Sequence, residues 1–171
     1  PKRSILFMTF FGEERGLLGS RYYGTHPLVP PVATIAQVNL EQMGRTDATN
    51  GPQIKGANLT GFDFSDLPSI LAEAAGSAGV RIWKDMPSSD AYFGLSDNQS
   101  LADLGIPAHT VSVAYDYPDY HKVSDTADKL DGRKKFAIDV SLPGMLNAAI
   151  KASPVFGGTL KFYDDGKIKD M

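Results

Sequence analysis

An apolar run that stops abruptly on glycine and acid constrains this chain more than any other feature. Residues 4–11 read SILFMTFF, and Gly12, Glu13 and Glu14 follow directly. An apolar run of this length bounded by glycine is typical of a buried strand in a parallel sheet covered on both faces. We therefore predict a first strand over residues 1–11. Its carboxyl end, where open α/β sheets collect ligands and catalytic groups, would carry the two glutamates.

The adjacent glutamates have two interpretations. In the first, one carboxylate ligates a metal ion while its neighbour takes a proton from the attacking water. In the second, they are a solvated helix start, where acidic side chains suit the positive end of the helix dipole. Because the dipeptide fits both, the choice between them depends on the rest of the chain.

Composition excludes several classes of protein. The 171 residues are 42% hydrophobic and 22% charged, which predicts one globular domain over residues 1–171. The net charge of −3, without a basic cluster, argues against a nucleic-acid partner. There is no apolar run of the roughly 18 residues that a membrane span needs. Since cysteine is absent, disulfides and thiolate metal ligands are excluded.

Hydrophobic period and turn residues predict the other elements. Strands are expected over residues 32–40, 53–55, 80–83 and 106–114, helices over residues 16–23, 65–79, 96–105 and 133–151, and a hairpin around residues 165–166. The chain opens on Pro1 rather than Met, and its first residues already lead into a strand. We therefore expect a piece of a longer protein, truncated at the N-terminus.

Three potential metal ligands lie at strand ends or in the loop after a strand, namely Glu14, Glu41 and His121. Carboxylate and imidazole together suit Zn²⁺ in a site that leaves one position open for water. Taken alone, Glu41 is equally well a strand-end charge. Asp97 fits a helix cap, a charge near the site, or both, and His109, inside a predicted strand, is expected to be a packing residue.

Four segments then resemble a known family, in the family's order. They are FFGEERGLLGS at residues 10–20, NLEQMGR at residues 39–45, SDN at residues 96–98 with GIPA at residues 105–108, and DYHKVSDT at residues 119–126. These are similar to motifs of the di-zinc exopeptidases, which include bacterial aminopeptidase S, aminopeptidase Y and the glutamate carboxypeptidases. The resemblance covers about residues 4–151.

The resemblance implies a three-layer α/β/α sandwich around a mostly parallel mixed sheet, of the phosphorylase/hydrolase-like type. It also implies a metallopeptidase that removes residues from the N-terminus of peptides and is secreted or periplasmic. Glu13 matches the general base, Glu14 and His121 match ligands of one zinc, and Glu41 matches a ligand of the other. Two zinc ions would polarise the peptide carbonyl and hold the free N-terminus.

Asp97, Tyr115 and Tyr120 are the expected substrate-binding residues. The tyrosines belong to the loop YDYPDYHKVS at residues 115–124, where aromatic side chains either line a pocket or simply pack. Substrate preference is therefore left open.

Two departures from the family pattern matter. Glu41 stands where many members have Asp, so the carboxylate is one methylene longer. The family's His-x-Asp motif and its bridging Asp precede the Glu-Glu segment, and this chain does not supply them. We therefore expect the chain alone to bind zinc weakly and to be nearly inactive until an upstream segment of the same domain joins it. Alternatives are a single-zinc enzyme like the glutaminyl-peptide cyclases and a metal-free binding or scaffold module.

Overall fold

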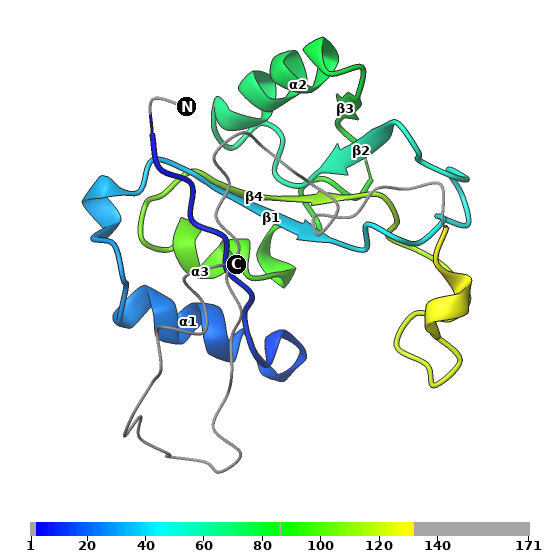
Figure 1. The fold of residues 1–171 in the computed structure, drawn as a ribbon, viewed down its shortest axis with the longest axis horizontal. Helices are drawn as coiled ribbons and strands as arrows, with labels where there is room; N and C mark the ends of the chain where they lie inside the picture. The colour runs from blue at the N-terminus through cyan, green and yellow to red at the C-terminus, as the bar shows by residue number, and fades with distance from the viewer. Residues whose placement is uncertain (1–2, 86, 132–171) are drawn as a thin grey trace, which may run out of the picture. The chain divides into compact units, whose positions relative to one another are not determined.

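The computed structural model describes residues 3–85 and 87–131 (Figure 1). The chain divides into two units, Pro1–Phe136 and Ala137–Met171, and the described residues belong to the first. The helix predicted over residues 133–151 and the hairpin around residues 165–166 lie outside the described residues. A single domain over the whole chain stays a prediction.

The described residues contain a mixed four-stranded sheet. Its strands are β1 (Gln37–Glu41), β2 (Gly56–Leu59), β3 (Arg81–Trp83) and β4 (Ala108–Ser112), in the order β1-β4-β2-β3. β1 runs parallel to β4 and β2 runs parallel to β3, whereas β2 and β4 are antiparallel. The mostly parallel, mixed sheet expected from the sequence is therefore confirmed.

Helices cover both faces of this sheet. α2 (Leu67–Ser77) packs on β3 and β4, α3 (Asn98–Ala102) packs on β4 and β1, and α1 (Leu18–Thr25) packs against α3. Figure 1 shows α2 on one side of the sheet and α1 with α3 on the other. Successive strand residues point to opposite faces, so Val111 joins the core under α2 while Ala108 joins the core with Leu101 of α3. The fold is a three-layer α/β/α arrangement.

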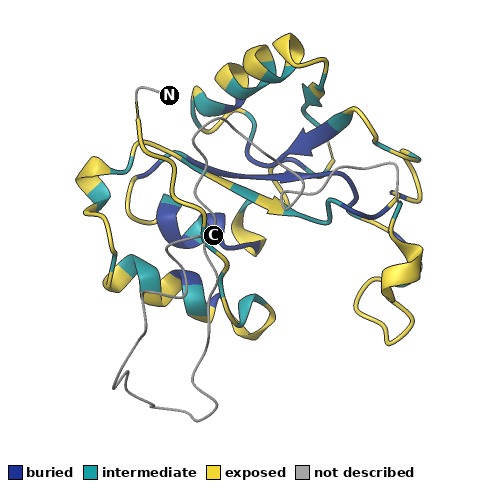
Figure 2. Cartoon of the chain, viewed as in Figure 1, coloured by how far each residue is buried: buried dark blue, intermediate teal, exposed yellow. Residues whose placement is uncertain are grey.

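The inner strand β4 is buried along its whole length, whereas the outer strand β1 is partly exposed (Figure 2). Every residue of β4 is buried. In β1, by contrast, Val38 and Leu40 are 41% and 50% exposed. Within the described part of the chain β1 is the last strand on its side of the sheet.

The first predicted strand is wrong for this structure. Residues 4–11 form no strand, and Ile5, Phe7 and Phe11 are 60%, 70% and 79% exposed. A strand needs a second backbone to accept and donate its hydrogen bonds, and none of the strands in residues 3–131 pairs with this segment. Only Phe10 of the segment packs against a core cluster.

Most other predicted elements exist, with shifted bounds. The strand expected from residue 32 begins at Gln37, because Pro31–Ala33 forms a 3₁₀ turn. The short strand expected over residues 53–55 is wrong in position, because those residues form no strand and β2 starts directly after them at Gly56. The helix expected from residue 16 begins at Leu18. None of the helices in the described residues is long and apolar enough to cross a membrane.

Candidate metal and catalytic site

The turn that carries Glu13 and Glu14 is shaped by glycine. Glu13–Arg15 is a 3₁₀ turn preceded by Gly12 in the left-handed region at φ 69°, where a residue without Cβ is favoured. Gly19, in the first turn of α1, donates its N–H to the Phe11 carbonyl at 2.7 Å. A Cβ at Gly19 would lie 2.6 Å from the Phe11 nitrogen. The acidic turn is therefore packed tightly against α1.

Glu14 and His121 meet although they lie far apart in the sequence. His121 Nε2 is 2.7 Å from Glu14 Oε1 across 107 positions of sequence, and both side chains are more than half exposed. His121 has φ 57°, an unusual conformation for a residue with a side chain. Its ring stacks on Tyr120 with centroids 3.9 Å apart. The structure therefore brings together the two residues that the resemblance assigns to one zinc.

Glu41 is the last residue of β1 and is held by a hydroxyl. Ser96 Oγ donates to Glu41 Oε2 at 2.6 Å, and Asn39 Nδ2 donates to Ser96 Oγ at 2.8 Å. Burial raises the pKa of the Glu41 carboxyl, the bond from Ser96 lowers it, and the charges of Asp97 and Glu14 raise it again. The carboxylate is thus oriented by the residues around Ser96 but is crowded by other acids.

Asp97 has a buried carboxylate, and one of its oxygens makes no hydrogen bond to the described residues. Its residue is 7% exposed, and its Oδ1 has no hydrogen-bond partner within the described residues. Asp97 occupies the position before α3, but its side chain makes no capping bond. The prediction of a helix cap is therefore wrong, and the alternative of a charge near the other acids agrees with the structure.

Glu13 lies among the other charged groups of this site. Burial raises the pKa of its carboxyl most, the charges of Glu14, Glu41 and Asp97 raise it further, and His121 lowers it. Each of these four groups therefore lies within electrostatic reach of Glu13. A carboxyl with a raised pKa is closer to the neutral range in which a general base and acid works best.

Tyr115 and Tyr120 lie within electrostatic reach of the acids, and the sequence analysis missed their neighbour Tyr92. Tyr92 stacks on Tyr115 with centroids 5.0 Å apart and planes 6° apart. Burial, then the charges of Asp85 and Glu41, raises the pKa of Tyr115. Burial, then Glu14, Glu41 and Glu13, raises that of Tyr120. Tyr92 could have been suspected only from its place in the aromatic loop before Ser96.

Asp47 anchors the start of the loop that contains Tyr115. Its Oδ1 accepts the N–H groups of Thr49 and Asn50 at 2.9 and 2.7 Å, and its Oδ2 accepts those of Tyr115 and Asp116 at 2.8 and 3.2 Å. Burial pushes the pKa of Asp47 up, but the four bonds hold it below its usual range. Nothing in the sequence marked this carboxylate.

The side chains at this site are of the kinds that bind zinc, but they are grouped in twos rather than threes. Carboxylates and an imidazole are suitable ligands for Zn²⁺, and the unpartnered Asp97 oxygen is a free donor of the right kind. Among the described residues, however, no three His, Asp or Glu side chains are grouped so that they could hold one ion. The site supplies Glu14 with His121 on one side, and Glu41 with Asp97 nearby.

Acids and an imidazole gathered where β1 ends, on a mixed sheet covered by helices, define a hydrolase-like α/β domain. The model of Peptidase family M28 matches residues 1–138. The chain therefore belongs to this peptidase family, as the four motifs indicated. No curated protein matches the chain.

Two solved structures are similar to the chain. An aminopeptidase from Aneurinibacillus sp. strain AM-1 is 28% identical, with a TM-score of 0.54 over 72% of this chain. The Legionella pneumophila LapA aminopeptidase is 24% identical, with a TM-score of 0.56 over 71% of this chain, and supports the fold alone. The chain spans 28% and 32% of the lengths of these two structures.

Proposed function

We propose that this chain supplies part of the catalytic site of a zinc-dependent aminopeptidase, which hydrolyses the N-terminal peptide bond of peptides. The observation that carries the proposal is the contact of Glu14 with His121 at 2.7 Å, in a chain of a peptidase family. The pKa of Glu13, raised by burial and by neighbouring acids, also favours it. A secreted or periplasmic location belongs to the proposal on family resemblance only.

The residues have separate tasks in this proposal. Glu14 with His121 would hold one zinc ion, and Glu41 would hold a second. Zinc supplies a Lewis acid that polarises the scissile carbonyl. The Glu13 carboxylate takes a proton from the attacking water and passes it to the leaving amine. Tyr115, Tyr120 and Asp97 border the substrate.

A further segment of the same catalytic domain completes the site in this proposal. Two ligands for one ion are fewer than the three protein ligands that catalytic zinc usually has. The small share of the two aminopeptidases that the chain covers supports this view. The chain by itself is therefore expected to bind zinc weakly and to hydrolyse peptides very slowly.

The test is zinc calorimetry together with hydrolysis of aminoacyl-anilides. Both are measured on the chain alone and on the chain joined to an upstream segment that carries the family's His-x-Asp motif. Two ions and rapid hydrolysis in the joined protein support the proposal. One ion with cyclisation of N-terminal glutamine would favour the cyclase alternative, and no ion would favour a scaffold. Tight binding of two ions by the chain alone would refute the incomplete site.

Substitution of the general base gives the first prediction. Glu13→Gln in the joined protein should reduce hydrolysis at least about 100-fold, because proton transfer by a positioned side chain contributes that much. Zinc content should stay the same, since Glu13 is not a proposed ligand. Glu14→Gln is the matched control and should lose zinc. If Glu13→Gln loses metal instead, the tasks of the two glutamates are reversed.

A further inference from the structure

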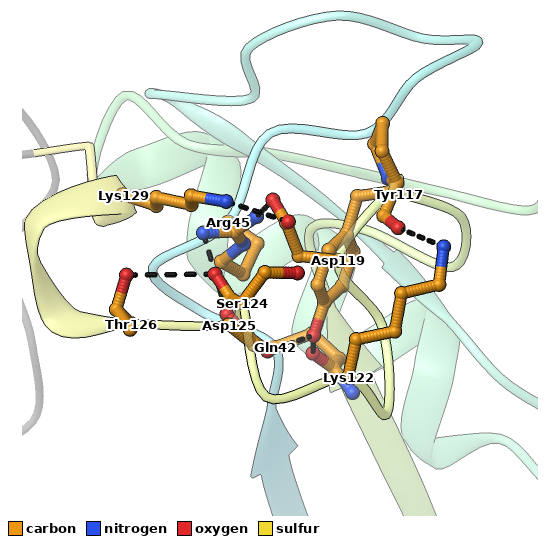
Figure 3. Close-up of polar contacts among 10 residues, drawn as sticks. Gln42, Arg45, Tyr117, Asp119, Lys122, Ser124, Asp125, Thr126 and Lys129 are labelled. Carbon is orange, nitrogen blue, oxygen red and sulfur yellow. Dashed lines mark hydrogen bonds and ion pairs between the residues drawn. The ribbon is translucent and has the colours of Figure 1, made fainter.

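A cluster of charged and aromatic side chains lies around Arg45, on the segment that leaves β1 (Figure 3). Arg45 is 8% exposed. Its Nη2 is 3.0 Å from Asp119 Oδ2 and its Nη1 is 3.4 Å from Asp125 Oδ1. Its guanidinium carbon is 4.5 Å from the centre of the Tyr117 ring. We refer to Arg45, Tyr117, Asp119 and Asp125 as the arginine clamp.

The two acids of the clamp bracket His121 in the chain. Asp119 comes before His121 and Asp125 after it, and Arg45 reaches both. Between them the backbone folds in successive turns, since Lys122 N–H donates to Asp119 O at 2.9 Å and Asp125 N–H to Lys122 O at 3.0 Å. The left-handed conformation of His121 persists only if the surrounding structure holds it. Arg45 ties together the two sides of this loop.

The same segment carries Glu41 at its other end. Directly after Glu41, the Gln42 side-chain oxygen accepts the Tyr117 hydroxyl at 2.7 Å. The Gly44 carbonyl then accepts the N–H of Asp131 at 2.9 Å. With the bonds of Asp47 described above, the segment 42–47 is bonded to the loop 115–131 at its beginning, middle and end. The Glu41 end and the His121 loop are therefore joined by several short bonds.

The guanidinium group of arginine is better suited to joining the two sides of this loop than the ammonium group of lysine. A planar guanidinium binds two carboxylates and stacks on an aromatic ring at the same time, whereas an ammonium is a compact point charge. Lys129 reaches only one of the acids, with Nζ 2.6 Å from Asp119 Oδ1. The partly buried pairs of Arg45 are also less screened by water and salt than exposed ion pairs.

We propose that Arg45 is a positioning residue, which fixes the His121 loop relative to the end of β1 and thereby sets His121 and Glu41 at their mutual distance. The consequence for metal binding rests on the proposed function. The fixed placement of the loop does not, so the two can be tested separately.

The test is amide hydrogen exchange on the full chain, followed by NMR. In Arg45→Met, the amides of Lys122 and Asp125 should exchange at least about tenfold faster relative to that of Thr110 in β4. Arg45→Lys should restore little of the loss. Arg81→Met is the matched control, since Arg81 lies over Trp83 on β3, and should leave the loop unchanged. Unchanged loop exchange in Arg45→Met, or an equal acceleration of all amides, would overturn the proposal.

Two further measurements keep the result decisive. If Arg45→Met does not fold, Asp125→Asn leaves the Arg45–Asp119 pair in place and should loosen the same amides to a smaller extent; unchanged exchange there would contradict the clamp. Zinc affinity of the joined protein should fall at least about tenfold in Arg45→Met, in step with the exchange. A wild-type protein that neither binds zinc nor hydrolyses anilides would refute the proposed function, while the exchange data would still decide the role of Arg45.

Discussion

The Asp97 carboxylate is the clearest case of a site residue that lowers the stability of the fold. A buried polar atom without a partner forfeits the hydrogen bonds that it had in water. Among the residues that the structure describes, Asp97 Oδ1 is such an atom, and the Asp97 charge also disfavours the ionised forms of Glu13 and Glu41. Charged groups that lower the stability of the folded protein are typical of functional sites.

Neutralising this carboxylate should therefore stabilise the metal-free chain. In Asp97→Asn we expect the free energy of unfolding, measured with urea in the presence of a chelator, to rise by about 1 kcal/mol. The exposed acid Asp116 gives the control, because Asp116→Asn should change stability by less than about 0.5 kcal/mol. A loss of stability in Asp97→Asn would mean that its charge is compensated by its neighbours.

His109 should make stability depend on pH in mildly acidic solution. It is 1% exposed, with Nε2 2.7 Å from Ser65 Oγ and Nδ1 2.8 Å from the Thr60 carbonyl. Burial lowers the pKa of the imidazole below its usual 6.5, although the bond to Thr60 raises it. The folded state thus favours neutral His109, so its contribution is complete above pH 6.5 and is lost as the pH falls through the lower, folded-state pKa.

Urea unfolding tests this expectation. It is measured from about pH 7.5 to about pH 5, a range that includes the ordinary pKa of histidine. Wild type should lose stability as the pH falls. His109→Gln should be less stable at about pH 7 and should lose clearly less stability than wild type as the pH falls, while the raised pKa values of Glu13 and Glu41 act in the opposite direction in both proteins. The exposed His26, stacked on Tyr22, gives the control, since His26→Gln should keep the wild-type slope. A slope in His109→Gln equal to that of wild type would contradict the role of His109.

At this scale the sequence predicted types of residue better than contacts. Strand ends and motifs pointed to Glu14, Glu41 and His121, and the structure does bring Glu14 and His121 together. The unpartnered oxygen of Asp97 and the clamp of Arg45 were not predictable, because neither spacing nor composition records which side chains meet across the fold.

At the scale of elements, the acidic turn depends on how closely α1 approaches it. The Phe11 backbone sits where a side chain on Gly19 would be. A side chain at this position would clash with the Phe11 backbone, which explains why the residue here is glycine. The position of Glu13 and Glu14 is therefore set partly by a residue that has no side chain.

Gly19→Ala should destabilise the chain by about 1–3 kcal/mol, because overpacking forces backbone shifts. It should also weaken the NMR contact between Glu14 and His121. Gly76 in α2 is the matched control: a Cβ there meets nothing within 4 Å, so Gly76→Ala should stabilise by roughly 0.5–1 kcal/mol. Equal effects of the two substitutions would contradict a packing role for Gly19.

Element type was largely predictable and element bounds were not. Period and turn residues identified β1, β3, β4 and α2 because these segments bury one face or both. Residues 4–11 have a strand pattern, but a strand is a property of two backbones, and the pattern describes only one. The left-handed Gly12 and Leu17 shifted the start of α1, which depends on backbone conformation rather than on hydrophobic period.

At the scale of the whole molecule, the described residues expose many large apolar side chains. Large apolar side chains are exposed to solvent along residues 4–11 and on β1, an outer strand of the described sheet. Large exposed apolar patches mark binding surfaces or aggregation sites, and an open strand edge adds unpaired backbone groups. In the proposed enzyme, another segment of the catalytic domain would cover this surface.

The isolated chain should therefore bind the dye ANS at neutral pH and self-associate as its concentration rises, as followed by fluorescence and sedimentation. Phe7→Asp with Phe11→Asp should reduce the fluorescence several-fold without lowering the unfolding midpoint. Val123, which is fully exposed in the His121 loop, gives the control, and Val123→Asp should have little effect. Weak dye binding by the wild type would mean that the exposed side chains do not form a continuous surface.

Asp47 has a consequence for what can replace it. Each of its oxygens faces two backbone N–H groups. Asparagine has almost the same outline but offers one oxygen and one NH₂, so either rotamer would point hydrogen at hydrogen. This position therefore distinguishes an acid from its own amide, which no measure of size or shape would reveal. Deamidation of an asparagine introduced here would repair the protein rather than damage it.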